Sequence, residues 1–201
     1  MRKSLECFLV NHQENEQNFK YNILTFLSGE LGSIMFKSHI FRAVVENFVV
    51  AVAAYSLGYS FTSMFHLGTA EVGGLWAVIS GVFVMADKES LTIKSAGMRV
   101  RASFIGCLIA GIYLYLFPFT VVGFAICIAL GVLLCHVFRI PDHIKTTSIT
   151  ISVVVIISVI VTDIGPITNA ALRFAESVIG SLTALGVAVA GVYIFRVKKS
   201  D

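Results

Sequence analysis

Long apolar runs separated by short polar segments make up most of this chain after about residue 42. A helix that crosses a bilayer needs about 20 apolar residues at about 1.5 Å per residue. The run from Ala102 to Phe138 is too long for one crossing, and Pro118 offers a turn within it. The pattern predicts an all-α polytopic membrane protein with six transmembrane helices, at about residues 42–62, 72–87, 99–117, 119–138, 146–163 and 170–195.

The segments on either side of this module (residues 41–196) are more polar. Residues 1–40 contain Glu6, His12 and Glu14, which interrupt any apolar core of a secretory signal, so we expect a cytoplasmic segment. Its portion from Tyr21 to Phe36 could lie along the membrane interface as an amphipathic helix. Residues 197–201 are expected to form a short cytoplasmic tail.

Charge placement predicts the orientation of the helices. Only 13% of the residues are charged, against about 25% in soluble domains. If both termini are cytoplasmic, 14 of the 15 basic residues fall in cytoplasmic segments, as the positive-inside rule requires, and only Arg173 lies on the far side. The low charged fraction makes the lipid bilayer the expected environment. With a net charge of only +3, no nucleic acid partner is expected.

Two segments 74 residues apart resemble each other. R-V-R-A-S-F-I-G-C-L-I-A begins at Arg99, R-F-A-E-S-V-I-G-S-L-T-A begins at Arg173, and six of the twelve positions are identical. The predicted orientation makes the two helices antiparallel, which suggests a 3+3 inverted repeat of the kind found in transporters. Each copy also carries a pair of small residues four positions apart, Gly106/Ala110 and Gly180/Ala184, that would let a partner helix approach closely. A chance match between apolar helices is the alternative.

The second and third predicted helices carry family-like motifs. The segment W-A-V-I-S-G-V-F-V-M-A-D begins at Trp76, and R-V-R-A-S-F-I-G follows after eleven residues. This arrangement resembles the fusaric-acid-resistance (FUSC) and aromatic-acid-exporter superfamily, whose second helix opens W-A-V-x-[ST] and whose third opens R-x-x-G-T-x-x-G. The R-x-x-E-x-x-x-G element at Arg173, Glu176 and Gly180 is similar to the family's last helix. The plant aluminium-activated malate transporters look like distant members.

The resemblance implies a transporter or channel for organic, often aromatic, anions. This chain has Ala102-Ser103 where the family has Gly-Thr, which keeps a small residue and a hydroxyl. It carries one membrane module, whereas many bacterial members carry two plus a soluble domain. Two copies are therefore expected to assemble as a homodimer, in a bacterial inner membrane. A non-transporting membrane scaffold or assembly partner is the alternative function.

Ionisable residues within the membrane are functional candidates because a charge there is costly unless it is paired. Arg99 and Arg101 are about 200° apart on a helix, so only one can face the protein interior. We expect that to be Arg99, which matches Arg173 in the repeat. Two arginines that merely set the topology are the alternative. The other candidates of this kind are Glu46, Asp163, Arg173 and Glu176.

Arg173 opposes the charge trend and lies one helical turn before Glu176. Its planar guanidinium could bind a carboxylate as Glu176 releases it, or the two residues could form a structural ion pair. Ser103 and Ser177 could donate hydrogen bonds to the same anion, or bond back to their own helix. The expected substrate site is thus Arg99, Arg173, Ser103, Ser177 and Glu176. Trp76 is expected to anchor its helix at the outer interface.

Other chemistry has little support in the sequence. The four cysteines have no C-x-x-C spacing and are read as small apolar packing residues rather than disulfides or ligands. The five histidines show no ligand spacing, so neither a metal nor a cofactor is expected. Without G-x-S-x-G or H-E-x-x-H, an intramembrane enzyme is the weakest interpretation.

Overall fold

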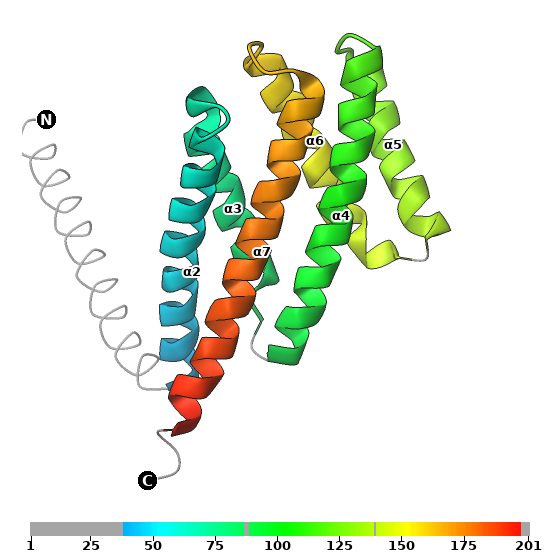
Figure 1. Cartoon of the computed structure of the whole chain (residues 1–201). Coiled ribbons are helices and arrows are strands. Elements are labelled where there is room, and N and C mark those ends of the chain that lie inside the picture. The colour runs from blue at the N-terminus through cyan, green and yellow to red at the C-terminus, as the bar shows by residue number, and fades with distance from the viewer. Residues whose placement is uncertain (1–37, 87–88, 139, 198–201) are drawn as a thin grey trace, which may run out of the picture. The chain divides into compact units, whose positions relative to one another are not determined.

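Six α-helices and two 3-10 turns are found in the residues that the computed structural model describes, which are 38–86, 89–138 and 140–197 (Figure 1). The α-helices are α2 (Ser38–Ser63), α3 (Ala70–Val84), α4 (Glu89–Leu116), α5 (Val121–Val137), α6 (Ile144–Ile160) and α7 (Pro166–Val197). The 3-10 turns are η1 (Leu67–Thr69) and η2 (Pro141–His143). The chain divides into two units, Met1–Val44 and Val45–Asp201.

Five helical stretches in the described ranges are long and apolar enough to cross a membrane. They are Ile40–Ser63, Leu67–Val84, Leu91–Leu116, Pro141–Ile160 and Pro166–Tyr193. The other apolar helix, α5, has 17 residues, or about 26 Å of helix, slightly less than the ~30 Å hydrocarbon core. The all-α membrane class is therefore confirmed.

The largest difference from the sequence prediction is the start of α4. Helix α4 begins at Glu89, ten residues before the predicted position 99, because charged residues weaken an apolar pattern without breaking a helix. Here Lys94 and Arg101 are exposed and Arg99 is buried. Residues 1–37 of the predicted N-terminal segment and 198–201 of the predicted tail lie outside the described residues.

The turn predicted at Pro118 separates α4 from α5. The Tyr113 hydroxyl donates to the Pro118 carbonyl oxygen at 3.1 Å, and the Thr120 amide donates to the Tyr113 hydroxyl at 3.0 Å. The Thr120 side chain caps α5 by accepting from the Gly123 amide at 3.0 Å. These local bonds fold α5 back beside α4.

Helices α4 and α7 pack against each other along their lengths and run antiparallel (Figure 1). Successive contacts show the direction: Gly111 lies against Ala170, the Phe104 and Phe174 rings are 5.7 Å apart, and Ser103 meets Ser177. Helix α3 packs mainly on α7 rather than on its sequence neighbour α4. Helix α6 likewise packs mainly on α4 rather than on α7.

Close packing of these helices depends on glycine. A Cβ on Gly106 would lie 2.8 Å from the Thr150 Cβ of α6, and one on Gly180 would collide with the Ala77 carbonyl oxygen of α3. Ala110 and Ala184, the partners of these glycines in the small-residue pairs, are fully buried. The packing therefore uses the small residues of both repeat copies.

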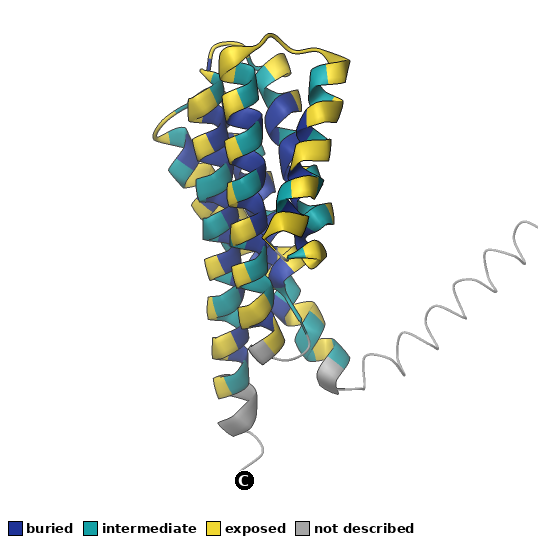
Figure 2. Cartoon of the chain, turned by 90° about the vertical axis from the view of Figure 1, so that its right-hand side faces the viewer, coloured by how far each residue is buried: buried dark blue, intermediate teal, exposed yellow. Residues whose placement is uncertain are grey.

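Figure 2 shows the buried residues concentrated where the helices meet and the exposed residues on the outside, and many of the exposed residues are large and apolar. One apolar cluster joins α4, α5, α6 and α7, and a smaller one contains Val50, Val84 and Ala184. Cys107, Cys127 and Cys135 are buried and free, so these three are packing residues as predicted. Cys7 lies outside the described residues.

Candidate functional site

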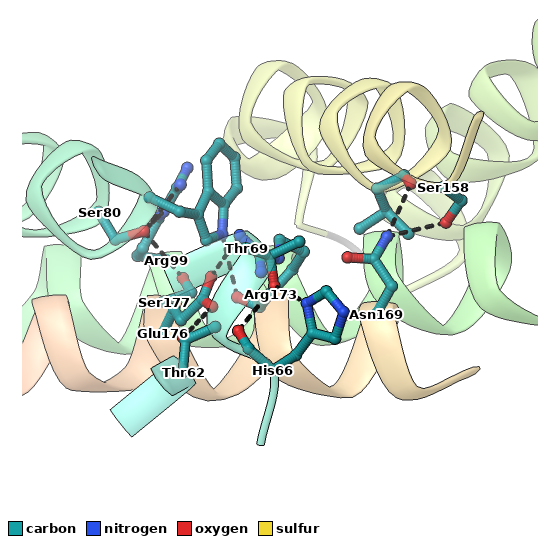
Figure 3. Close-up of polar contacts among 12 residues, drawn as sticks. Thr62, His66, Thr69, Ser80, Arg99, Ser158, Asn169, Arg173, Glu176 and Ser177 are labelled. Carbon is teal, nitrogen blue, oxygen red and sulfur yellow. Dashed lines mark hydrogen bonds and ion pairs between the residues drawn. The ribbon is translucent and has the colours of Figure 1, made fainter. Parts of the chain in front are cut away.

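Seven polar side chains from α2, α3, α4 and α7 come together in the interior, and we call them the buried polar cluster; Figure 3 labels all of them except Ser103. Each is at most 3% exposed. The members are Thr62, Ser80, Arg99, Ser103, Arg173, Glu176 and Ser177. The five residues predicted from the sequence as a substrate site all belong to it.

Arg173 and Glu176 form the charged pair of the cluster, one turn apart on α7. The Arg173 Nη1 lies 3.0 Å from the Glu176 Oε2, and both side chains are fully buried. The other carboxylate oxygen, Oε1, accepts a hydrogen bond from the Thr62 hydroxyl at 2.6 Å. Among the described residues, however, no guanidinium N–H of Arg173 makes an aligned hydrogen bond. The Nη1 of Arg173 is thus held to Glu176 by charge, while its Nε and Nη2 make neither a hydrogen bond nor an ion pair within the described residues.

Glu176 and Thr62 fit beside α3 because residue 73 is glycine. A Cβ there would lie 2.6 Å from the Glu176 Oε1 and would also clash with the Thr62 hydroxyl. Only a residue without a side chain leaves room for the Thr62–Glu176 hydrogen bond. Gly73 therefore belongs to the wall of the site.

Three serines connect the two arginine-bearing helices. The Ser103 and Ser177 hydroxyl oxygens are 2.6 Å apart, and the Ser80 hydroxyl donates to Ser177 at 3.2 Å. By contrast, the Ser181 hydroxyl donates to the carbonyl oxygen four residues earlier, as Ser and Thr in helices often do. Ser103 and Ser177 bond to each other across the helix interface instead.

Arg99 is buried by α3 and its aromatic side chains. Its Nε and Nη2 donate to the Ser80 hydroxyl at 3.3 and 3.0 Å, and its guanidinium lies 5.0 Å from the Trp76 ring and 5.3 Å from the Phe83 ring. Its Nη1 has no hydrogen-bond partner among the described residues. Arg101 is exposed, as the angle between the two positions requires.

Trp76 does not lie where the sequence suggested. The ring is 3% exposed, and its indole N–H donates to the Arg173 carbonyl oxygen at 3.0 Å. The guanidinium of Arg99 lies over the face of the Trp76 ring, and the indole N–H of Trp76 bonds to the Arg173 backbone. Trp76 therefore contacts both arginines. An outer-interface anchor is excluded because the ring packs against α7 and Arg99, away from lipid.

The remaining ionisable candidates lie outside the cluster. Asp163, in the α6–α7 loop, pairs with His66 at 3.0 Å and is 69% exposed. Glu46 is 8% exposed, near the start of α2. Within the described ranges, no group of His, Cys, Asp and Glu has the arrangement of a metal site.

Charge and burial together define what the cluster can do. It contains two guanidinium groups and one carboxylate, so it retains one positive charge among side chains that are at most 3% exposed. Charges in such surroundings interact strongly with one another and with any ion that enters. The unused N–H groups of Arg173 and Arg99 have the fork geometry that binds carboxylates.

Thr62, Ser80 and Gly73 were missed by the sequence reasoning. Ser80 is the last residue of the W-A-V-I-S segment, so the motif itself marked it. Thr62 and Gly73 belong to no motif in the sequence. Their role becomes visible only in the structure, where helix packing brings them beside Glu176.

A model of the fusaric acid resistance protein-like family matches residues 50–187. The chain belongs to this family. The match covers all seven residues of the buried polar cluster. No curated protein and no solved structure matches the chain significantly. Family membership makes this an integral membrane protein of the resistance-protein exporter type, a class of transporters rather than enzymes.

Proposed function

We propose that this chain transports organic anions, aromatic acids among them, and that Arg173 and Arg99 bind the anion. The observation that carries the proposal is the state of Arg173. Its side chain is fully buried, yet none of its N–H groups makes an aligned hydrogen bond within the described residues. Buried polar groups are normally satisfied, so unused donors on a buried cation indicate a group kept ready for a ligand.

The contacts around Glu176 suggest how an anion could enter. A substrate carboxylate can take the planar fork of Arg173 while Glu176 turns away. Glu176 does not lose its last partner in doing so, because Thr62 already donates to its Oε1 at 2.6 Å. Ser103 and Ser177 lie beside the pair and have hydroxyl donors that could reorient toward the anion. In this exchange the carboxylate of the substrate replaces the carboxylate of Glu176 beside Arg173.

The topology that we propose has six crossings, with both termini cytoplasmic and α2–α4 and α5–α7 as inverted repeats. Three observations support the repeat. The equivalent residues Ser103 and Ser177 are in contact, and α4 and α7 run antiparallel. Gly106 of α4 packs against α6, the middle helix of the second half. Its equivalent, Gly180 of α7, packs against α3, the middle helix of the first half. Helix α5 counts as a crossing because 17 residues lie at the lower limit for spanning a bilayer.

The cluster is closed to solvent, since Arg173, Glu176, Ser103 and Ser177 are all fully buried. Transport consequently requires the halves to move, or a path that opens where two copies of the chain meet. A homodimer in the bacterial inner membrane is the assembly that we propose. In a carrier the two halves would rock about the arginines, whereas in a channel the arginines would select anions.

The test is anion flux through purified protein in liposomes, with benzoate and a dicarboxylate as substrates. Arg173→Ala should reduce flux to background, and Arg173→Lys should restore only part of it because an ammonium cannot form the planar fork. Lys145→Gln, which removes an exposed cation from α6, is the matched control and should transport normally. Full flux through correctly folded Arg173→Ala would refute the assignment. Background flux in the wild type, with a stoichiometric partner on purification, would favour the scaffold function.

A further inference from the structure

A second polar pocket lies away from the buried polar cluster, between the first turns of α4 and the η2–α6 junction. Its volume is about 300 Å³, and it is lined by Ile93, Lys94, Gly97, Arg101, Asp142 and His143, among others. Unlike the grooves between α4 and α5 or between α2 and α7, whose linings are almost entirely apolar, this pocket is bordered by charged side chains. The proposed transport site uses none of these residues.

His143 gives the pocket its unsatisfied polar group. The residue is only 5% exposed, and neither ring nitrogen has a hydrogen-bond partner in the part of the chain that the structure describes. An imidazole always has at least one N–H to donate. A buried donor without a partner, on the wall of a cavity, indicates a ligand with acceptor oxygens.

The charged side chains of the pocket indicate the sign and the magnitude of the charge on that ligand. Lys94 and Arg101 are cations and Asp142 is an anion, so the pocket retains one net positive charge. A phosphodiester, with a single negative charge, balances it. The guanidinium of Arg101 suits phosphate oxygens geometrically. The pocket also opens at the N-terminal end of α6, where the helix dipole favours an anion.

The position of the pocket in the membrane indicates the source of the phosphate. The candidate spans Leu91–Leu116 and Pro141–Ile160 both begin at this pocket, which places it at the level where hydrocarbon gives way to headgroups. Ile93, on the pocket wall, is 52% exposed and presents an apolar surface beside the charges. Basic pockets between membrane helices at this depth commonly bind acidic headgroups.

We propose that this pocket binds a phosphate group, supplied by the phosphodiester headgroup of an anionic phospholipid. Arg101 and Lys94 contact the phosphate oxygens, His143 donates its N–H, and the acyl chains lie against Ile93 and the apolar faces of α4 and α6. Such a lipid fixes the start of α4 against the start of α6. The proposal depends on the membrane position of these helices and not on the transported substrate.

The experiment measures thermal unfolding of the purified full chain during titration with phosphatidylglycerol or inorganic phosphate, with native mass spectrometry to count retained lipids. Phosphatidylglycerol should raise the melting temperature and remain bound, while inorganic phosphate should not. If inorganic phosphate stabilised the protein and the lipid did not, the lipid source would be overturned. If neither stabilised it, the phosphate pocket itself would be overturned.

Variants separate the pocket from general surface charge. Gly97→Leu should block lipid retention without altering any charge, and it should fold, because a Cβ on Gly97 meets nothing within 4 Å. Arg101→Gln should weaken phosphatidylglycerol binding by about tenfold, the loss expected for one hydrogen bond to a charged group. Lys145→Gln removes the same charge from an exposed residue of α6 that does not line the pocket, and should bind like the wild type. Unchanged lipid retention in Gly97→Leu, or an equal loss in Lys145→Gln, would overturn the proposal.

Discussion

The hydroxyl oxygens of Ser103 and Ser177 lie 2.6 Å apart, and these two residues occupy the same position in the two copies of the repeated segment. In a structure built from two halves related by a two-fold axis, a residue can touch its own equivalent only at that axis. The contact therefore marks where the axis of the proposed inverted repeat would pass. The arginines lie one turn from it on α4 and α7.

The two sides of this axis differ in charge. Arg173 has Glu176 three residues later, whereas the residue three after Arg99 is Ala102. Arg99 relies instead on Ser80 and on the faces of Trp76 and Phe83. The halves thus share a framework but present two different arginine environments to an anion.

Cysteines at the equivalent serines should cross-link. Ser103→Cys combined with Ser177→Cys is expected to form a disulfide under mild oxidation, because the side-chain oxygens are already in contact. Mass spectrometry of proteolytic fragments measures the yield. Leu108→Cys with Leu182→Cys is the matched pair, with the same 74-residue separation but both side chains exposed, and should stay reduced within one chain. Equal cross-linking of both pairs would contradict the α4–α7 register.

Removing one member of the buried ion pair should destabilise the protein strongly. Glu176→Gln leaves Arg173 as a buried cation without a counter-charge, at an expected cost of about 3–5 kcal/mol in the free energy of unfolding. Arg173→Met combined with Glu176→Leu removes both charges and should return stability to within about 2 kcal/mol of the wild type. Denaturant unfolding in detergent measures both.

The same double variant separates structure from transport. If Arg173 binds the anion, Arg173→Met/Glu176→Leu should fold well yet show only background flux in liposomes. A well-folded double variant that transports at the wild-type rate would show that the pair is structural only.

Two glycines of α7 should respond oppositely to alanine. Gly180→Ala places a methyl group against the Ala77 carbonyl oxygen, so α3 must move away, at an expected cost of about 1–3 kcal/mol in the free energy of unfolding. Gly186→Ala meets nothing within 4 Å and should be neutral or stabilise the helix by about 0.5–1 kcal/mol. Similar unfolding curves for the two variants would argue against close α3–α7 packing.

The proposed orientation can be read from thiol accessibility. In a background with Cys7 replaced by serine, Asp163→Cys should react with a membrane-impermeant maleimide in intact cells, since Asp163 is exposed in the α6–α7 loop. Lys145→Cys, exposed at the start of α6, should react only after permeabilisation. The buried native cysteines provide a low background. Reversed labelling would invert the topology.

The sequence by itself determined the class of the protein and its family. Hydropathy depends only on consecutive residues, so the apolar runs predicted the helices, and the all-α membrane class is confirmed. The motifs at Trp76 and Arg99 identified the family before any geometry was known. Helical periodicity required that only one of Arg99 and Arg101 face inward, and the match to Arg173 in the repeat selected Arg99, which is buried while Arg101 is exposed.

The partners of these residues were decided by the tertiary structure alone. Three contacts depend on how neighbouring helices are rotated and offset. Glu176 accepts a hydrogen bond from Thr62, Arg99 donates to Ser80, and the Trp76 ring is buried beside α7. This register is fixed by contacts between small residues far apart in the chain, such as Gly180 against Ala77 and Gly73 against Thr62. A linear pattern contains no information on such offsets, because many registers bury the same apolar faces equally well.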